Sequence, residues 1–154
     1  MSSIVDALYE LKYNPFEYGP YLASFYMAID KSENNILLAP LVIPLCSHPV
    51  FNKKISGAMF GEKKYSSIWS IFNDRTQLYD LQERIDGFQA LTEQCIQYCL
   101  INDWLSVNEQ GLSFHKGNGS DSAFAHQKTA AKLGRLFSGH SVVEIYAFLG
   151  VKPR

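Results

Sequence analysis

The stretch NNILLAPLVIPLCSHP, residues 34–49, constrains the fold of this chain more than any other segment. From Ile36 to Cys46 it has no polar side chain, yet Pro40 and Pro44 interrupt it. A membrane-spanning helix needs about 20 apolar residues, and this run is too short. A proline inside a helix removes a backbone hydrogen bond and kinks it. We therefore expect this segment to lie in the hydrophobic core. It is either extended around Ile36–Leu38 or a kinked helix that is apolar on all sides. It either lies wholly in the core or also contributes an exposed edge to which a partner docks.

The length of 154 residues predicts a single domain, 1–154, with its own core. We expect N-terminal helices and the apolar core segment in 1–50, and a loop-rich part in 51–76. A helix–helix–hairpin unit is expected in 77–116, and C-terminal helices in 120–154. The fold class predicted is mainly α with a small β-hairpin, a winged-helix-like helical domain.

Charge is unevenly distributed along the chain. Residues 1–110 carry eight Lys and Arg against thirteen Asp and Glu, whereas residues 111–154 carry six against two. The C-terminal part therefore suits an acidic partner, but its excess is small compared with a basic nucleic-acid tail.

Apolar residues recur at helical spacing from the N-terminus onward, and this pattern predicts helices over 2–12 and 15–30. Asn14 can cap the second helix, with Pro15 in the first helical position. The second helix is expected to bury Leu22, Phe25, Tyr26 and Ile29.

Residues 77–102 have the clearest helical period, and we prefer two helices with a break near Ala90–Thr92 and Thr92 as an N-cap. Leu105–Phe114 alternates around the turn residues Asn108–Gly111, which predicts a hairpin. Helix, helix and hairpin follow in the order of a winged helix.

A helix capped by Ser120 or Asp121 is expected to run to Phe137, and a last one from Ser141 to Leu149. Lys128, Lys132 and Arg135 fall on one side of the first of these helices. They either complement its dipole or contact phosphate or an acidic partner.

The search for a catalytic site is negative, and we expect no enzyme, metal or cofactor. GAMFGEKKY, residues 57–65, lacks the spacing of a phosphate-binding loop. The four histidines are scattered, and His126 is predicted to be a core histidine. Cys46, Cys95 and Cys99 are expected to be buried apolar residues. The N-terminus has no cationic start followed by an apolar core, so we expect a cytoplasmic protein.

Four segments follow one another along nearly the whole chain: Asn-Pro-Phe at 14–16 opening a helix, the apolar run ending in His48-Pro49, KLGRLF at 132–137 and IYAFLGVKPR at 145–154. In order and spacing they resemble the middle component of prokaryotic three-component ABC ATPase systems, which include Lamassu-type antiphage defence. The loop Gly57–Lys64 departs from that pattern.

The resemblance implies a non-enzymatic adaptor between an SMC/Rad50-like ABC ATPase and an effector, such as a nuclease. DNA is then bound indirectly, through the partners, or contacted weakly at its phosphate backbone. The alternative is a stand-alone winged-helix DNA-binding protein. The partner-interface residues expected from the matching segments are Asn14, Pro15, Phe16, Pro44, His48, Leu133, Arg135, Phe137, Leu149 and Val151.

Overall fold

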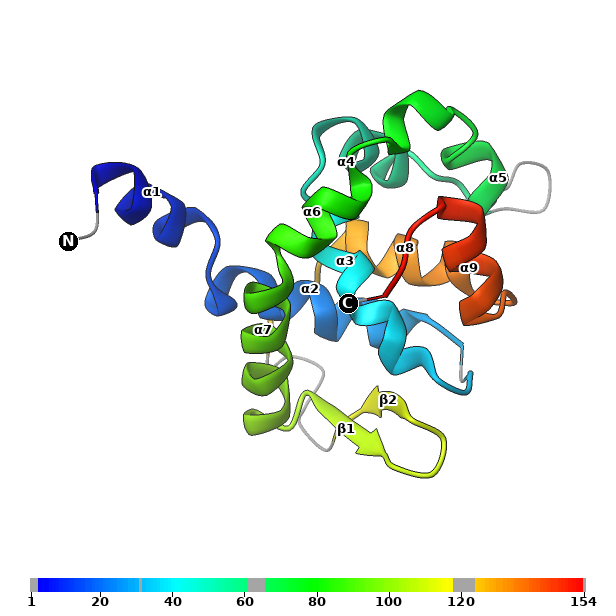
Figure 1. Cartoon of the computed structure of the whole chain (residues 1–154). Helices are drawn as coiled ribbons and strands as arrows, with labels where there is room; N and C mark the ends of the chain where they lie inside the picture. The colour runs from blue at the N-terminus through cyan, green and yellow to red at the C-terminus, as the bar shows by residue number, and fades with distance from the viewer. Residues whose placement is uncertain (1–2, 31, 61–65, 118–123, 154) are drawn as a thin grey trace.

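A computed structural model describes residues 3–30, 32–60, 66–117 and 124–153 (Figure 1). The α-helices are α1 (Ile4–Lys12), α2 (Pro15–Ala28), α3 (Ala39–Cys46), α4 (Pro49–Ser56), α5 (Ile68–Ile71), α6 (Leu81–Gly87), α7 (Gln89–Ile101), α8 (Lys128–Phe137) and α9 (Val142–Leu149). Two 3₁₀ turns, η1 (Asn35–Leu38) and η2 (Arg75–Leu78), and two strands, β1 (Leu105–Asn108) and β2 (Ser113–Lys116), complete the order. The prediction of a mainly α chain with a small hairpin is confirmed.

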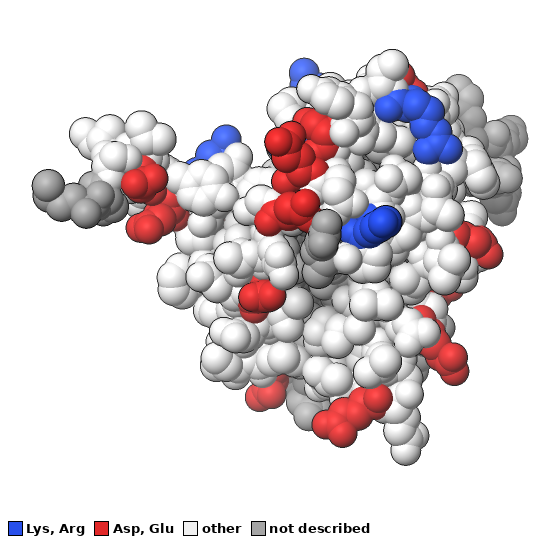
Figure 2. Space-filling model, viewed as in Figure 1, with Lys and Arg blue, Asp and Glu red and all other residues white. Residues whose placement is uncertain are grey.

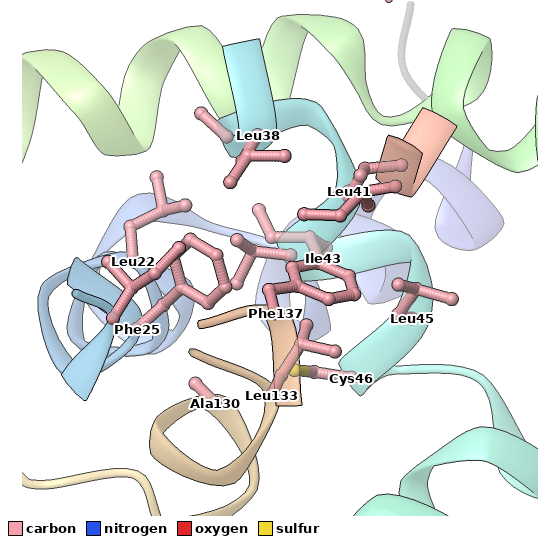
Figure 3. Packing of buried hydrophobic residues seen from close by; sticks show 14 of the residues in the cluster. Leu22, Phe25, Leu38, Leu41, Ile43, Leu45, Cys46, Ala130, Leu133 and Phe137 are labelled. Atoms are coloured by element: carbon pink, nitrogen blue, oxygen red, sulfur yellow. The ribbon is translucent and has the colours of Figure 1, made fainter. Parts of the chain in front are cut away.

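The apolar run 36–46 forms the centre of the core as η1 followed by α3, so the helical alternative is the right one. Figure 3 shows Leu38, Leu41, Ile43 and Leu45 among side chains from α2 and α8. Each of the four is at most 1 % exposed. A helix apolar on all sides is stable only when other elements surround it, and α2, α6, α7 and α8 do so here.

Pro44 lies inside α3, where it cannot donate a backbone hydrogen bond. Its own carbonyl accepts two hydrogen bonds from the Arg84 guanidinium, Nε at 3.3 Å and a terminal nitrogen at 3.2 Å. Arg84 also donates to the Ser47 hydroxyl at 2.9 Å. Arg84, from α6, therefore satisfies a carbonyl that the end of α3 leaves without a partner in the helix.

α2 and α8 cross at very short range. A Cβ added to Gly134 would lie 2.6 Å from the Phe25 carbonyl oxygen and 3.1 Å from the Ile29 nitrogen. The Ser24 hydroxyl accepts a hydrogen bond from the Gln127 amide at 2.9 Å, which joins α2 to the start of α8. The absence of a side chain at Gly134 is what permits this crossing.

The hairpin is confirmed, with Leu105 paired to Lys116 and Asn108 to Ser113. Buried Asn35 attaches it to the core through Phe114, whose amide donates to Asn35 Oδ1 at 2.8 Å and whose carbonyl accepts from Nδ2 at 3.2 Å. The Tyr26 hydroxyl donates to the Asn35 carbonyl at 2.8 Å. Through its side chain and its main-chain carbonyl, buried Asn35 therefore connects η1 to β2 and α2.

The preference for two helices in 77–102 is confirmed, but the break lies at Phe88, not near Thr92. Thr92 is buried inside α7 and caps nothing. Phe88 ends α6 and precedes α7, so that the two helices follow each other with a bend (Figure 1). The order helix, helix, hairpin is present, while the winged-helix likeness stays a prediction.

Two local expectations are wrong. α8 begins at Lys128, because residues 124–127 are not helical and Phe124 packs on Trp104 at 5.1 Å between ring centroids. His126 is consequently exposed rather than a core residue. Of the segment 51–76, the described residues hold most of α4, all of α5 and the start of η2, with irregular stretches between them. The expected cap at Ser120 or Asp121 lies outside the described residues.

Among the residues that the structure describes, no single helix is long and apolar enough to cross a membrane. The pair formed by 35–46 and 49–56 reaches the required length and composition only with a bend of 104°.

Candidate interaction surfaces

The described part of the chain holds no group of three or more His, Cys, Asp or Glu side chains that could bind a metal ion. All three cysteines are buried, free thiols. Burial raises the pKa of Cys95 and of Cys99 to about 12 and that of Cys46 still further, so the thiols stay protonated at neutral pH.

One widely exposed apolar surface is that of α1, the arm, which stands out from the body in Figures 1 and 2. None of its residues is buried. Ile4 is 80 % exposed, Leu8 61 % and Leu11 74 %. At 100° per residue these three side chains lie within about 60° of one another, on one face of the helix. A helix with such an uncovered face normally packs against something else.

The arm is held at both ends by side-chain caps. Ser3 and Asp6 form a capping box at its N-terminus. At the other end, Asn14 Nδ2 donates to the carbonyls of Glu10 and Leu11 at 3.1 and 3.2 Å. Asn14 Oδ1 accepts from the Glu17 amide at 3.0 Å, so one side chain caps the end of α1 and the start of α2.

Asn14→Ala is expected to remove the caps of both helices and to destabilise the arm by about 0.5–2 kcal/mol. Amide hydrogen exchange in residues 4–12 should accelerate, with little change in the buried part of α2. Asn102→Ala, which removes a single exposed bond to the Tyr98 carbonyl, is the matched control. Unchanged exchange in the arm would contradict the capping role of Asn14.

Four tyrosines, Tyr9, Tyr13, Tyr18 and Tyr21, continue the surface of the arm onto α2. Their ring centroids are separated in turn by 4.8, 5.7 and 5.0 Å. We call this row the tyrosine ladder. Burial, helped by the neighbouring tyrosines, raises the pKa of Tyr18 to about 12, so its hydroxyl is neutral at physiological pH. The ladder is a partly exposed aromatic surface of the kind enriched in protein interfaces.

A second apolar surface lies at the opposite end of the molecule, where α5 and α9 meet (Figure 1). Trp69 is 60 % exposed and contacts the Phe148 ring at 4.2 Å between centroids. The Arg75 guanidinium lies 4.9 Å from the Phe148 ring centroid and donates to the Phe148 carbonyl. Together with His140 and Glu144 these residues line a pocket of about 490 Å³. Trp and Arg are the residue types that most often dominate binding energy at interfaces.

The predicted interface residues fall into two groups in the structure. Asn14, Pro15 and Phe16 lie together at the base of the arm, and Phe16 is 70 % exposed with its ring 5.2 Å from that of Tyr98. The other apolar residues predicted for the interface lie in the core: Pro44, Leu133, Phe137, Leu149 and Val151. These side chains are buried within the chain, where they stabilise the fold, and their role at an interface stays a prediction.

The basic residues of α8 do not form a free cationic face. The Lys132 ammonium donates to the carbonyls of Ser56 and Ala58 at 2.6 and 2.8 Å, where α4 ends. Desolvation, with the nearby cations Lys128 and Arg135, lowers the Lys132 pKa. Arg135 stacks 4.2 Å above the Phe60 ring centroid. Lys132 thus stabilises the C-terminus of α4, while Lys128 is exposed.

His48 caps α4 rather than facing solvent fully. Its Nδ1 accepts from the Val50 and Phe51 amides at 3.1 and 3.4 Å, which requires an unprotonated Nδ1. Its Nε2 lies 4.0 Å from the Asp80 carboxylate. Burial, with the Arg84 charge, lowers the pKa of His48, and Asp80 opposes this shift.

Folding should therefore favour neutral His48. Its stabilising effect is complete above the unfolded pKa of about 6.5 and is lost as the pH falls through the lower folded pKa. Denaturant unfolding between about pH 7.5 and about pH 5 should show a loss of stability that His48→Asn, which keeps an acceptor at the cap, lacks. Equal pH dependence in both proteins would contradict this assignment.

Sequence reasoning did not select the arm or Trp69 as functional. The helical spacing of Ile4, Leu8 and Leu11 was visible, but periodicity reports which residues share a face and not whether that face is covered. Trp69 carries no sequence signal, because its exposure depends on the short helix α5 and on its contact with Phe148.

Comparison with known protein families matches residues 2–153 to the family described as ABC-three component (ABC-3C) system Middle Component 3. Neither the curated proteins nor the solved structures gave a match. The family covers the arm, the apolar core run and the C-terminal helices alike. This chain belongs to the Middle Component 3 family of ABC-three component systems.

Proposed function

We propose that this chain is a non-enzymatic accessory subunit that links an SMC/Rad50-like ABC ATPase to an effector such as a nuclease, in a cytoplasmic antiviral defence complex. The observation that carries the proposal is the uncovered apolar face of the arm. Solvent exposure of Ile4, Leu8 and Leu11 is unfavourable by roughly 25 cal/mol per Å² of apolar surface, and a partner that buries them recovers this free energy. Membership of a three-component family supports a partner within the same system.

A linking subunit needs two separate contact areas, and the molecule offers two. The arm and the start of α2, which carries Phe16, lie at one end, and α5 and α9, which carry Trp69 and Phe148, lie at the other (Figure 1). α2, α3 and α8 pack tightly between the two ends, so the body can hold the two partners in a fixed relative position. We assign one partner to each end.

Direct DNA recognition has less support. α7, which precedes the hairpin as a recognition helix would, contains no Lys or Arg, and Glu93 is exposed on it. Phosphate binding requires cations on the contacting surface. Lys128 can make weak backbone contact with DNA, but Lys132 is occupied by the carbonyls of Ser56 and Ala58.

The test is co-expression of the three components encoded together, with affinity capture on the ATPase. We expect this chain to be retained and Leu8→Glu to weaken its retention about ten- to a hundredfold, because a charge would have to be buried. Leu112→Glu, the same change at the exposed hairpin turn, is the matched control and should bind normally. Failure of the unaltered chain to associate with both other components would overturn the proposal.

A further inference from the structure

The arm offers a surface suited to another helix. Ile4, Leu8 and Leu11 are spaced by four and three residues, the alternation found along a helix–helix seam. Val5 and Tyr9 widen this face to one side. A partner helix would bury the row by inserting its own side chains between these residues.

The arm alone is too small for a stable interface. Its nine residues extend about 13 Å, whereas specific complexes bury about 800 Å² on each partner. The tyrosine ladder adds the missing area, because Tyr9 and Tyr13 connect the arm to Tyr18 and Tyr21 without interruption. Tyr13 also contacts Phe88, at the break between α6 and α7, with ring centroids 5.3 Å apart. The surface therefore runs from the arm to the body.

Acidic side chains lie beside this surface rather than within it. At 100° per residue, Asp6 lies about 60° beyond Tyr9 around α1, and Glu10 lies about 100° beyond Leu11 on the side away from Leu8. Glu17 follows in α2 and Glu83 is exposed on α6, and we call these four residues the acidic rim. Figure 2 shows acidic side chains on the arm and on the facing side of the body.

The nearby cations do not neutralise this rim fully. The Lys12 ammonium lies over the Tyr13 ring, 5.1 Å from its centroid. The Arg84 guanidinium is turned inward to the Pro44 carbonyl. A partner carrying Lys or Arg beside its apolar side chains would meet complementary charge.

We propose that the arm and the tyrosine ladder bind an amphipathic helix of a partner subunit whose apolar stripe is flanked by Lys and Arg. This inference rests on the proposed function and adds the chemistry of the bound segment. A second copy of this chain is a poorer occupant, because its own arm carries Asp6 and Glu10 and would bring like charges together.

Cross-linking identifies the segment. In the co-expressed complex, a photoreactive phenylalanine derivative at Leu8 should cross-link to a partner segment with apolar residues at helical spacing and Lys or Arg beside them. The same derivative at Leu112 should not. A complex that forms without a Leu8 cross-link, or with a cross-link to a second copy or to an acidic segment, overturns this inference and leaves the proposed function intact. Absence of any complex overturns both.

Charge reversal tests the rim. Glu10→Lys with Glu83→Lys should weaken the complex at least tenfold at low salt, and the difference from the unaltered chain should shrink as salt rises. Glu33→Lys with Glu109→Lys makes the same change in net charge at two exposed positions outside both the arm and the Trp69 surface, and should bind normally. Equal loss in both double variants, or no loss in the first, overturns the basic character of the bound helix.

Discussion

Phe25→Ala is expected to lower the free energy of unfolding by about 3–5 kcal/mol. The Phe25 side chain is fully buried, and its ring contacts those of Tyr26 and Phe137 at 4.9 and 6.0 Å between centroids. Truncation removes this apolar contact and leaves a cavity between α2 and α8, the helices that pack most extensively. Urea or guanidinium unfolding followed by circular dichroism measures the loss.

Phe16→Ala is the matched control for this experiment, because it makes the same chemical change in the same helix at a side chain that is 70 % exposed. Its effect on stability should stay within about 1 kcal/mol, since it loses little beyond the edge contact with Tyr98. The same variant should weaken partner binding. Comparable destabilisation by the two variants would show that Phe25 does not lie in the core.

Gly134→Val is expected to cost about 3 kcal/mol or more, because its Cβ would clash with the backbone of Phe25 and Ile29. The clashing atoms belong to the main chain, so no side-chain rotation relieves the contact. α2 and α8 would have to separate, which disturbs the packing of Phe25 and Phe137. Thermal unfolding should show a large drop in the melting temperature.

Gly87→Ala, a substitution at another helical glycine, is expected not to lower stability. No atom lies within 4 Å of the added Cβ, and alanine restricts the unfolded chain more than glycine does. Its stability should therefore change little or rise by up to about 1 kcal/mol. If Gly134→Val were as well tolerated as Gly87→Ala, the close crossing of α2 and α8 would be refuted.

Local sequence signals located the elements with clear boundaries. Asn14 and Pro15 mark the start of α2, Gly150 adopts a left-handed conformation at the end of α9, and the turn residues 108–111 lie in the hairpin. Each of these positions has a conformational preference of its own, so neighbouring residues suffice to predict it.

Features that depend on distant contacts were not predicted. The helix that contains Pro44 ends beside Arg84, which is forty residues away in the sequence. At the start of α8, the Gln127 backbone N–H donates a hydrogen bond to the Ser24 hydroxyl. Lys132 was identified as a surface cation because the carbonyls of Ser56 and Ala58 could not be foreseen. Nothing in a single sequence reports such pairs, which form only when the chain has folded.

The residues predicted to form the interface lie in two different environments for a similar reason. Residues 14–16 lie at the base of the arm, whereas Leu133 and Phe137 are core side chains. A segment can match a family's pattern because every member must pack it in the same way. Resemblance alone therefore located the family but did not distinguish packing positions from contact positions.

The double role of Asn14 has a thermodynamic consequence for assembly. Because one amide fixes the end of α1 and the beginning of α2, the direction of the arm is set before any other subunit arrives. A preorganised element loses less conformational entropy on association than one that must order itself first. Weakening this joint should slow productive encounters even where every contacting side chain is retained.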